Sequence, residues 1–89
     1  MSHTSDKERQ ALYQAELGAG LARRLRDTRL EVGLSTAALA RQSGLGRTLV
    51  LLAEAGRGGA VGLAAVAALA DALGVRRAWL AFGEGPREP

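Results

Sequence analysis

The sequence contains no cysteine, and its aromatic side chains are limited to Tyr13, Trp79 and Phe82. Without thiols the chain can form neither a disulfide nor a cysteine-ligated zinc site, so its fold must depend on packing alone. The missing cysteines also fit a reducing compartment, and we therefore expect a cytoplasmic protein. With so few aromatics, the core must be built from leucine, valine and alanine side chains.

Long apolar runs and clusters of catalytic side chains are also missing. No run approaches the roughly 18 apolar residues that a membrane-spanning helix needs, so we expect no membrane association. Residues 1–5 are not followed by an apolar stretch, and we interpret them as a frayed start rather than a signal peptide. His3 is the only histidine, and no acids cluster with a base, so we expect no metal, no cofactor and no enzyme activity. The glycine-rich segments 18–20 and 56–62 lack the preceding strand and the Lys-Ser/Thr pair of phosphate-binding loops.

The chain is instead rich in leucine, alanine and arginine. Leucine and alanine are strong helix formers, and 89 residues suffice for one domain, so we predict an all-α fold. Between residues 18 and 83 nine arginines stand against four acids, which gives this segment a net charge of +5. Arginine suits bidentate contacts with phosphate, so this surplus indicates a nucleic-acid partner. The plainer alternative is a solvated basic surface.

The first helical segment carries a start signal and an internal interruption. Ser5 begins a capping box, which predicts that a helix starts there. Gly18 and Gly20 should then weaken or kink the helix. We therefore interpret residues 1–17 as an N-terminal helical extension and residues 19–32 as the first helix of the domain proper.

Later glycine and serine positions divide the rest of the chain. They predict four further helices, over residues 36–43, 47–55, 63–73 and 76–82. The domain would then occupy residues 18–83. Residues 84–89 contain both prolines, and we predict a flexible tail there.

Residues 36–55 form the most informative unit, two short helices that join at Gly44. Ala40 is small enough to let the second helix approach closely, and glycine readily adopts the positive φ that the turn needs. Val50 and Ala53 are three residues apart, so they share the helix face that can pack back on the first helix. This is the layout of a DNA-binding helix-turn-helix, although other short helical hairpins can imitate it.

The surrounding sequence resembles the phage-repressor family (Xre/Cro/C1 type) of helix-turn-helix proteins. The similar segments are Arg26–Ser35, Gly44–Gly56, Leu69–Val75 and Trp79–Gly83. They correspond to the end of the family's first helix, its turn and recognition helix, its fourth helix and its fifth, over about residues 20–84. The resemblance implies a five-helix, lambda-repressor-like helix-turn-helix domain, here with an extra N-terminal helical extension.

The resemblance also implies an internal ion pair. Arg29 and Glu54 match two family positions that form a largely buried pair between the first helix and the recognition helix. If they are buried here, removal of one partner should cost about 3–5 kcal/mol of folding free energy. The alternative is that both are ordinary surface charges.

The family's DNA contacts can be carried over to individual positions of this chain. Base contacts would come from the outer face of the recognition helix, at Arg47, Thr48, Leu51 and Leu52. Phosphate contacts would come from Thr36, Arg41 and Arg57. For Arg41 a solvated surface charge is an equal alternative.

The recognition helix departs from the family pattern at several of these positions. Gly46 stands where serine or threonine usually caps the helix, and Thr36 is shorter than the usual glutamine. Leu51 and Leu52 should face outward where relatives carry polar or basic side chains, and exposed leucines suit a protein surface better than a base sequence.

Two functions therefore stay open. One is a small sequence-specific DNA-binding regulator of transcription, expected to be a repressor; the other is a protein-interaction module, antitoxin-like or an adaptor, that docks a protein partner through the two leucines.

Regulators of this type bind two-fold operators as dimers, so we expect a homodimer on double-stranded DNA in the nucleoid. Two segments could make the dimer contact. One is the N-terminal extension with Leu12, Tyr13 and Leu17, and the other is residues 79–82. The alternative is that each segment only caps its own core.

Overall fold

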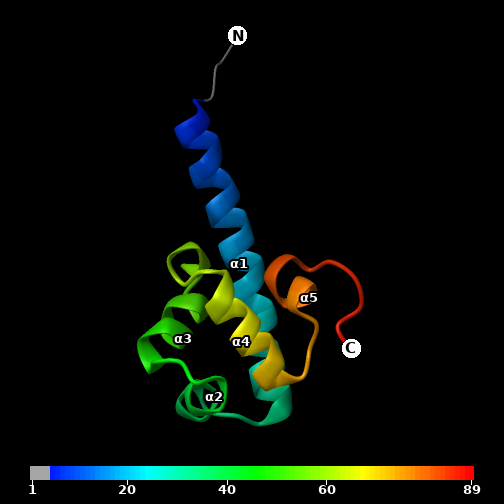
Figure 1. Ribbon diagram of the computed structural model, residues 1–89. Helices are drawn as coiled ribbons and strands as arrows, with labels where there is room; N and C mark the ends of the chain where they lie inside the picture. Colours follow the sequence, from blue (N-terminus) through cyan, green and yellow to red (C-terminus); the bar gives the residue numbers. More distant parts are fainter. Residues whose placement is uncertain (1–4) are drawn as a thin grey trace.

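The computed structural model describes residues 5–89 as an arrangement of helices, with no strand in that range (Figure 1). The helices are α1 (Asp6–Val32), α2 (Thr36–Ser43), α3 (Arg47–Glu54), the short 3-10 helix η1 (Gly58–Ala60), α4 (Leu63–Leu73) and α5 (Arg77–Phe82). The predicted all-α, five-helix fold is confirmed. Residues 1–4, with His3 and most of the frayed start expected there, lie outside the described range.

α1 is a single 27-residue helix that continues through Gly18 and Gly20. Ser5 caps its first turn through a side-chain hydrogen bond, and Gly33 ends it with a φ of 80°. Gly18 is buried, and a Cβ atom at this position would collide with the carbonyl oxygen of Gly56. The expected interruption of the helix is therefore wrong, because Gly18 lets the chain after α3 pack closely against α1 instead of breaking it.

The core is aliphatic, as the scarcity of aromatic residues requires, and every α-helix contributes to it. Its large, fully buried side chains are Leu25, Leu39, Val50, Leu69 and Leu80, one from each α-helix in turn. Burial of each such side chain stabilises the fold by about 1.5–3 kcal/mol. Trp79 packs against this core from its edge, where it is half-buried.

The N-terminal part of α1 projects beyond the rest of the molecule (Figure 1). Every residue from 5 to 17 is exposed, whereas buried residues begin at Gly18. We call this projecting part, residues 5–17, the stalk. The division of the chain into an extension over 1–17 and a domain over 18–83 stays a prediction.

Arg24 attaches α1 to the end of α5. Its Nε donates a hydrogen bond to the carbonyl oxygen of Leu80 at 2.9 Å, and its Nη2 donates to that of Ala81 at 3.1 Å. These carbonyls belong to the last turn of α5, which lacks intrahelical partners for them. Partial burial lowers the pKa of Arg24 from its ordinary value.

The C-terminal tail, predicted to be flexible, lies against the domain in the structure. The Arg87 guanidinium donates a hydrogen bond from Nη1 to Glu31 Oε2 at 2.6 Å, and it lies 5.9 Å from the ring centroid of Trp79. The backbone carbonyl of Arg87 also accepts a hydrogen bond from the Arg76 backbone N–H at 2.9 Å. These contacts link the tail to both α1 and the start of α5.

Candidate nucleic-acid interface

α2 and α3 form a short helical hairpin whose ends are set by local capping. Ser35 accepts a hydrogen bond from the backbone N–H of Ala38 at 3.0 Å, which begins α2. Gly44 ends α2 with a φ of 74°, a conformation that costs little only for glycine. α3 then starts after Gly46, so the turn is short enough to hold the two helices at a fixed angle.

The inner face of α3 is held by the core. Val50 and Ala53 have no exposed surface, and they belong to the same buried cluster as Leu39 and Ala40 of α2. Rotation of α3 about its axis would expose these side chains to water. The residues on the opposite side of the helix are therefore presented to solvent in one orientation.

An ion pair connects α3 to α1. Arg29 donates hydrogen bonds from Nε and Nη2 to the two carboxylate oxygens of Glu54, at 2.9 and 2.8 Å. Its Nη1 donates a third bond to the carbonyl oxygen of Leu34 at 2.9 Å. The two side chains keep only 13% and 10% of their surface exposed, so the paired charges are almost enclosed. The bidentate geometry fixes both the distance and the angle between the helices.

The outer face of α3 presents Arg47, Thr48 and Leu51, all of which are exposed. Leu52 is only half-buried at the edge of this face, so the expectation that both leucines point outward is wrong for Leu52. The turn of the helix does not explain this difference, because at about 100° per residue Leu51 and Leu52 lie equally far from the buried side of Val50 and Ala53. Three of the four expected base-contact residues therefore share one exposed face.

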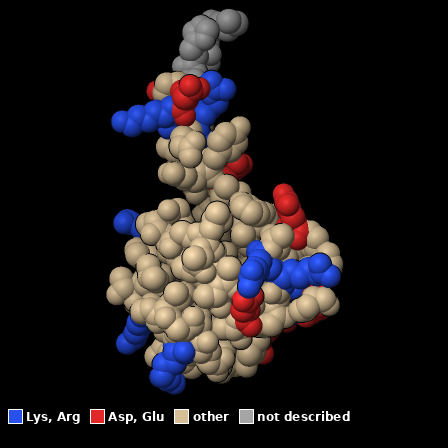
Figure 2. Space-filling view, in the orientation of Figure 1, with Lys and Arg blue, Asp and Glu red and all other residues tan. Residues whose placement is uncertain are grey.

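The residues expected to contact phosphate lie around that face. Thr36 is the half-buried first residue of α2, Arg41 is exposed in its last turn, and Arg57 is exposed directly after α3. Figure 2 shows basic side chains along the edge formed by α2, α3 and the following loop, with no acidic side chain beside them in this view. The edge is therefore positively charged on both sides of α3.

The N-terminal ends of α2 and α3 add to the positive character of this edge. Neither first turn contains an acidic residue, and Gly46 offers no side chain to cap α3. The backbone N–H groups of a first turn lack intrahelical partners and favour an anion. Uncapped N–H groups at the start of α3 are therefore available to a phosphate oxygen.

Other kinds of site have little support in the described range. Residues 5–89 present no group of three His, Cys, Asp or Glu side chains that could hold a metal ion. No helix in the same range is both long and apolar enough to cross a membrane. An apolar cavity of about 190 Å³ is lined by α1, η1, α4 and α5, and no residue of α2 or α3 borders it.

Two residues that position this edge were missed by the sequence analysis. Gly18 brings the chain after α3 against α1, and Arg24 secures α5 to the same helix. For Gly18 a signal existed, because a glycine inside an otherwise strong helical pattern often marks a close packing contact. For Arg24 no local signal existed, because its acceptors lie 56 and 57 residues away.

The comparisons with known proteins agree with this geometry. A family model described as a helix-turn-helix domain matches residues 20–81. The matched range runs from within α1 to within α5 and contains the whole α2–α3 hairpin. No curated protein and no solved structure matches the chain. Because the matched range covers well over half of the 89 residues, the chain belongs to the helix-turn-helix domain family.

Proposed function

We propose that this chain is a small, sequence-specific DNA-binding regulator of transcription, of the phage-repressor (Xre/Cro/C1) type, and that it acts as a repressor. The observation that carries the proposal is the outer face of α3. Arg47 and Thr48 are exposed on it, while Val50 and Ala53 hold the opposite face in the core. Membership in the helix-turn-helix family supports DNA as the ligand.

In the proposed complex α3 lies in the major groove. The Arg47 guanidinium donates two hydrogen bonds to O6 and N7 of a guanine, the commonest specific contact in this groove. The Thr48 hydroxyl contacts a neighbouring base, and its methyl group and Leu51 can meet thymine methyl groups. Leu52 contributes only from the edge of the face, because it is half-buried.

Phosphate contacts position the helix in the groove. Arg57 and Arg41 pair with backbone phosphates on either side of α3, and Thr36 contacts a phosphate at the start of α2. These contacts carry no sequence information, but they fix the register in which Arg47 meets the bases. The uncapped start of α3 at Gly46 provides further donors to the backbone.

The proposed regulator acts as a homodimer on a two-fold site in double-stranded DNA. A dimer places two recognition helices against half-sites about one helical turn apart, so the operator should be a near-palindrome. Its place of action is the cytoplasm, at the nucleoid, because its ligand is chromosomal DNA. Neither a metal nor a cofactor takes part in the proposed binding.

A protein-docking role for α3 is the second candidate. The observation that favours it is Leu51, which keeps 49% of its surface exposed in the middle of the recognition helix. A leucine there gives little discrimination between bases, but it suits an apolar protein surface. In this alternative the chain keeps the fold and uses α3 to hold a protein partner.

Selection from random duplex DNA with the purified full chain tests the proposal. We expect a near-palindromic sequence to be enriched, and we expect Arg47→Ala to lower the affinity for it by roughly tenfold or more, since a bidentate arginine–guanine contact contributes about 1–3 kcal/mol. Arg23→Ala is the matched control. Arg23 is an exposed arginine of α1 that lies outside the α2–α3 edge, so its replacement should leave the affinity unchanged.

Failure to enrich any sequence would contradict DNA recognition, as would unchanged binding in Arg47→Ala. The docking alternative then makes its own prediction. Leu51→Asp should abolish capture of a protein partner without unfolding the domain, because Leu51 is exposed. Leu52→Asp is unsuitable for this purpose, since a half-buried leucine also contributes to the fold.

A further inference from the structure

We propose that the stalk binds the stalk of a second copy of this chain, antiparallel and related by a two-fold axis. The contact is centred on Leu12 and Tyr13, with Arg9 of one copy opposite Glu16 of the other. It rests on the proposed homodimer and names the contact that forms it, but its test uses the chain without DNA, so its failure is distinguishable from a failure of DNA recognition.

The first step is the exposure of large apolar side chains on the stalk. Leu12 and Tyr13 keep 63% and 60% of their surface exposed, and together with Arg9 and Glu16 they line a shallow hollow. We call these four residues the stalk face. Figure 2 shows mostly uncharged side chains, with an acidic side chain at the right-hand side, between the charged tip of the projecting helix and the rounded body. Contiguous exposed apolar surface of this kind marks an interaction site.

The second step is the direction in which the stalk face points. α1 packs on the body through Leu21, Leu25 and their neighbours. At about 100° per residue, Leu12 lies on the opposite side of the helix from these buried leucines, and Tyr13 lies on the flank between the two sides. A partner helix can therefore lie along the stalk face, which the packing of α1 on its own body leaves uncovered.

The third step is charge complementarity, which selects a second copy and its direction. Arg9 precedes Leu12 by three residues, and Glu16 follows Tyr13 by three residues. In an antiparallel pair centred between Leu12 and Tyr13, this symmetry places each Arg9 opposite the partner's Glu16, twice per dimer. A parallel pair would place like charges together. Opposite charges across a helix pair set partner choice and orientation.

Arg9 is free to exchange partners. Within one copy it pairs with Asp6 at 3.1 Å, but the two side chains keep 58% and 100% of their surface exposed. Such exposed pairs contribute little to stability and are readily replaced. The intrahelical pair therefore does not compete strongly with a contact to Glu16 of a second copy.

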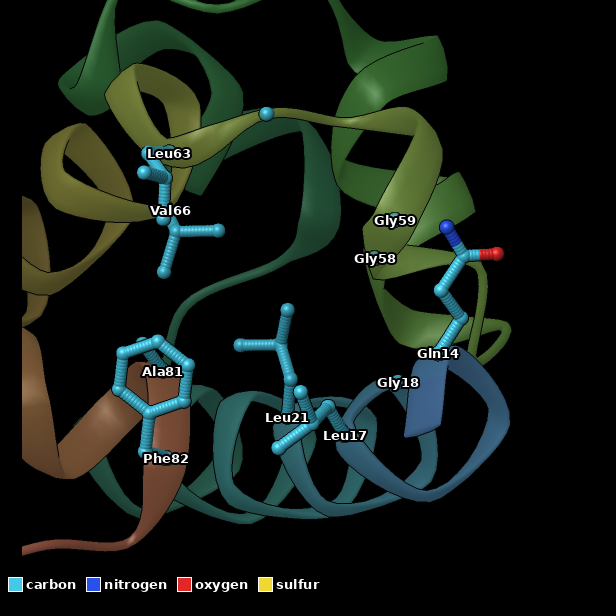
Figure 3. A pocket seen from close by; sticks show the side chains of 11 residues that line it. Gln14, Leu17, Gly18, Leu21, Gly58, Gly59, Leu63, Val66, Ala81 and Phe82 are labelled. Atoms are coloured by element: carbon cyan, nitrogen blue, oxygen red, sulfur yellow. The ribbon is translucent and has the colours of Figure 1, made fainter. Parts of the chain in front are cut away.

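The last step is the size of the surface. Stable interfaces bury at least about 1,200 Å² in total, more than two short helical segments offer. The apolar surface continues from Tyr13 to Leu17, which borders the cavity shown in Figure 3. Across that cavity lie Leu63 and Phe82, both exposed. An antiparallel partner centred between Leu12 and Tyr13 runs its N-terminal turn alongside residues 17–20, so the contact can extend from the stalk face toward this region.

Sedimentation analysis of the purified full chain, without DNA, tests the proposal. It measures the mass of the wild-type chain and of variants in which the charge at Arg9 or Glu16 is reversed. The wild-type chain should have twice the mass of the 9.2 kDa monomer. Arg9→Glu should place two acids opposite each other at both ends of the contact, and Glu16→Arg should place two arginines there. Each variant alone should dimerise about tenfold more weakly or worse, because facing like charges are costly.

An equimolar mixture of the two variants should restore the dimer. In the mixed pair the carboxylate introduced by Arg9→Glu in one chain faces the guanidinium introduced by Glu16→Arg in the other. At the opposite end of the contact the unchanged Glu16 of the first chain faces the unchanged Arg9 of the second, so every facing charge is opposite. Arg26→Glu is the control, an equal charge change at an exposed position of α1 beyond the stalk, and it should dimerise as the wild type does.

Three results would overturn the proposal. They are a monomeric wild-type chain at high concentration, single variants that dimerise as strongly as the wild type, and a mixture that stays monomeric. Misfolding cannot explain such results if helical circular dichroism is retained, because stalk residues lie outside the core.

Discussion

Arg29 and Glu54 face each other across α1 and α3 through two parallel hydrogen bonds of 2.9 and 2.8 Å. Both side chains are nearly enclosed, and they are 25 residues apart in the sequence. The pair links the longest helix of the fold to the helix with the exposed Arg47 face. Stability and the orientation of that face therefore depend on the same contact.

We predict that Glu54→Ala lowers the free energy of unfolding by about 3–5 kcal/mol, because it leaves the Arg29 charge enclosed without a counter-charge. Urea unfolding followed by circular dichroism measures the change. Asp71→Ala is the matched control, since Asp71 forms an exposed pair with Arg77 and its loss should leave the unfolding midpoint nearly unchanged. Equal midpoints for Glu54→Ala and the wild type would show that the pair contributes nothing to stability.

We predict that Gly18→Ala destabilises the protein, although the same change inside an ordinary helix stabilises by up to about 1 kcal/mol. A Cβ atom at position 18 would collide with the Gly56 carbonyl, and forcing such a shift costs about 1–3 kcal/mol. The measurement is the unfolding midpoint in urea. Gly59→Ala provides the comparison, because a Cβ there would meet only Gln14 at an ordinary 3.8 Å. A more stable Gly18→Ala variant would rule out the proposed packing role.

The helices and Gly18 show which features of the fold local sequence signals can predict and which they cannot. The order and type of the helices followed from glycine, serine and leucine positions, because capping and helical periodicity act within a few residues. Gly18 was misinterpreted, because its meaning depends on Gly56, which lies far along the chain but next to α1. A sequence rule for glycine describes the isolated helix, whereas the folded chain decides whether the missing Cβ atom weakens or permits a contact.

The candidate interface was predictable to a similar extent. The exposure of Thr48 follows from the burial of Val50 and Ala53, since Thr48 lies on the opposite side of the helix. Arg47 is three residues from Val50, and it is exposed as the first residue of α3. The partial burial of Leu52 did not follow, because hydropathy gives adjacent leucines the same value whatever side they face. The arrangement of the tail around Arg87 was also out of reach, since it depends on Glu31 and Trp79 from distant segments.

We predict that Gly46→Ser stabilises the protein by about 0.5–1 kcal/mol, because serine supplies the side-chain cap that α3 lacks and reduces the freedom of the unfolded chain. Gly46 has an ordinary extended conformation, φ −68° and ψ 146°, and open space around it, so the new side chain fits. The Tm should rise by about 2–8 °C. Gly44→Ser is the matched control two residues earlier and should lower the Tm, because Gly44 has a positive φ of 74°. A lower Tm for Gly46→Ser would mean that glycine is required at the start of α3.

We predict that Arg57→Ala and Arg47→Ala change DNA binding in different ways, because the first residue is assigned to phosphate and the second to a base. Loss of one phosphate contact weakens binding to every sequence and reduces the slope of log Kobs against log salt by about 0.9. Arg57→Ala should therefore keep the sequence preference and flatten the salt dependence. Arg47→Ala should keep the slope but lose the preference for guanine at one position of each half-site. Titrations of the selected duplex and of a duplex with that guanine replaced, each at several salt concentrations, separate the two effects. An altered base preference in Arg57→Ala would show that Arg57 contacts a base rather than a phosphate. A flatter salt dependence in Arg47→Ala would show that Arg47 contacts a phosphate rather than a base.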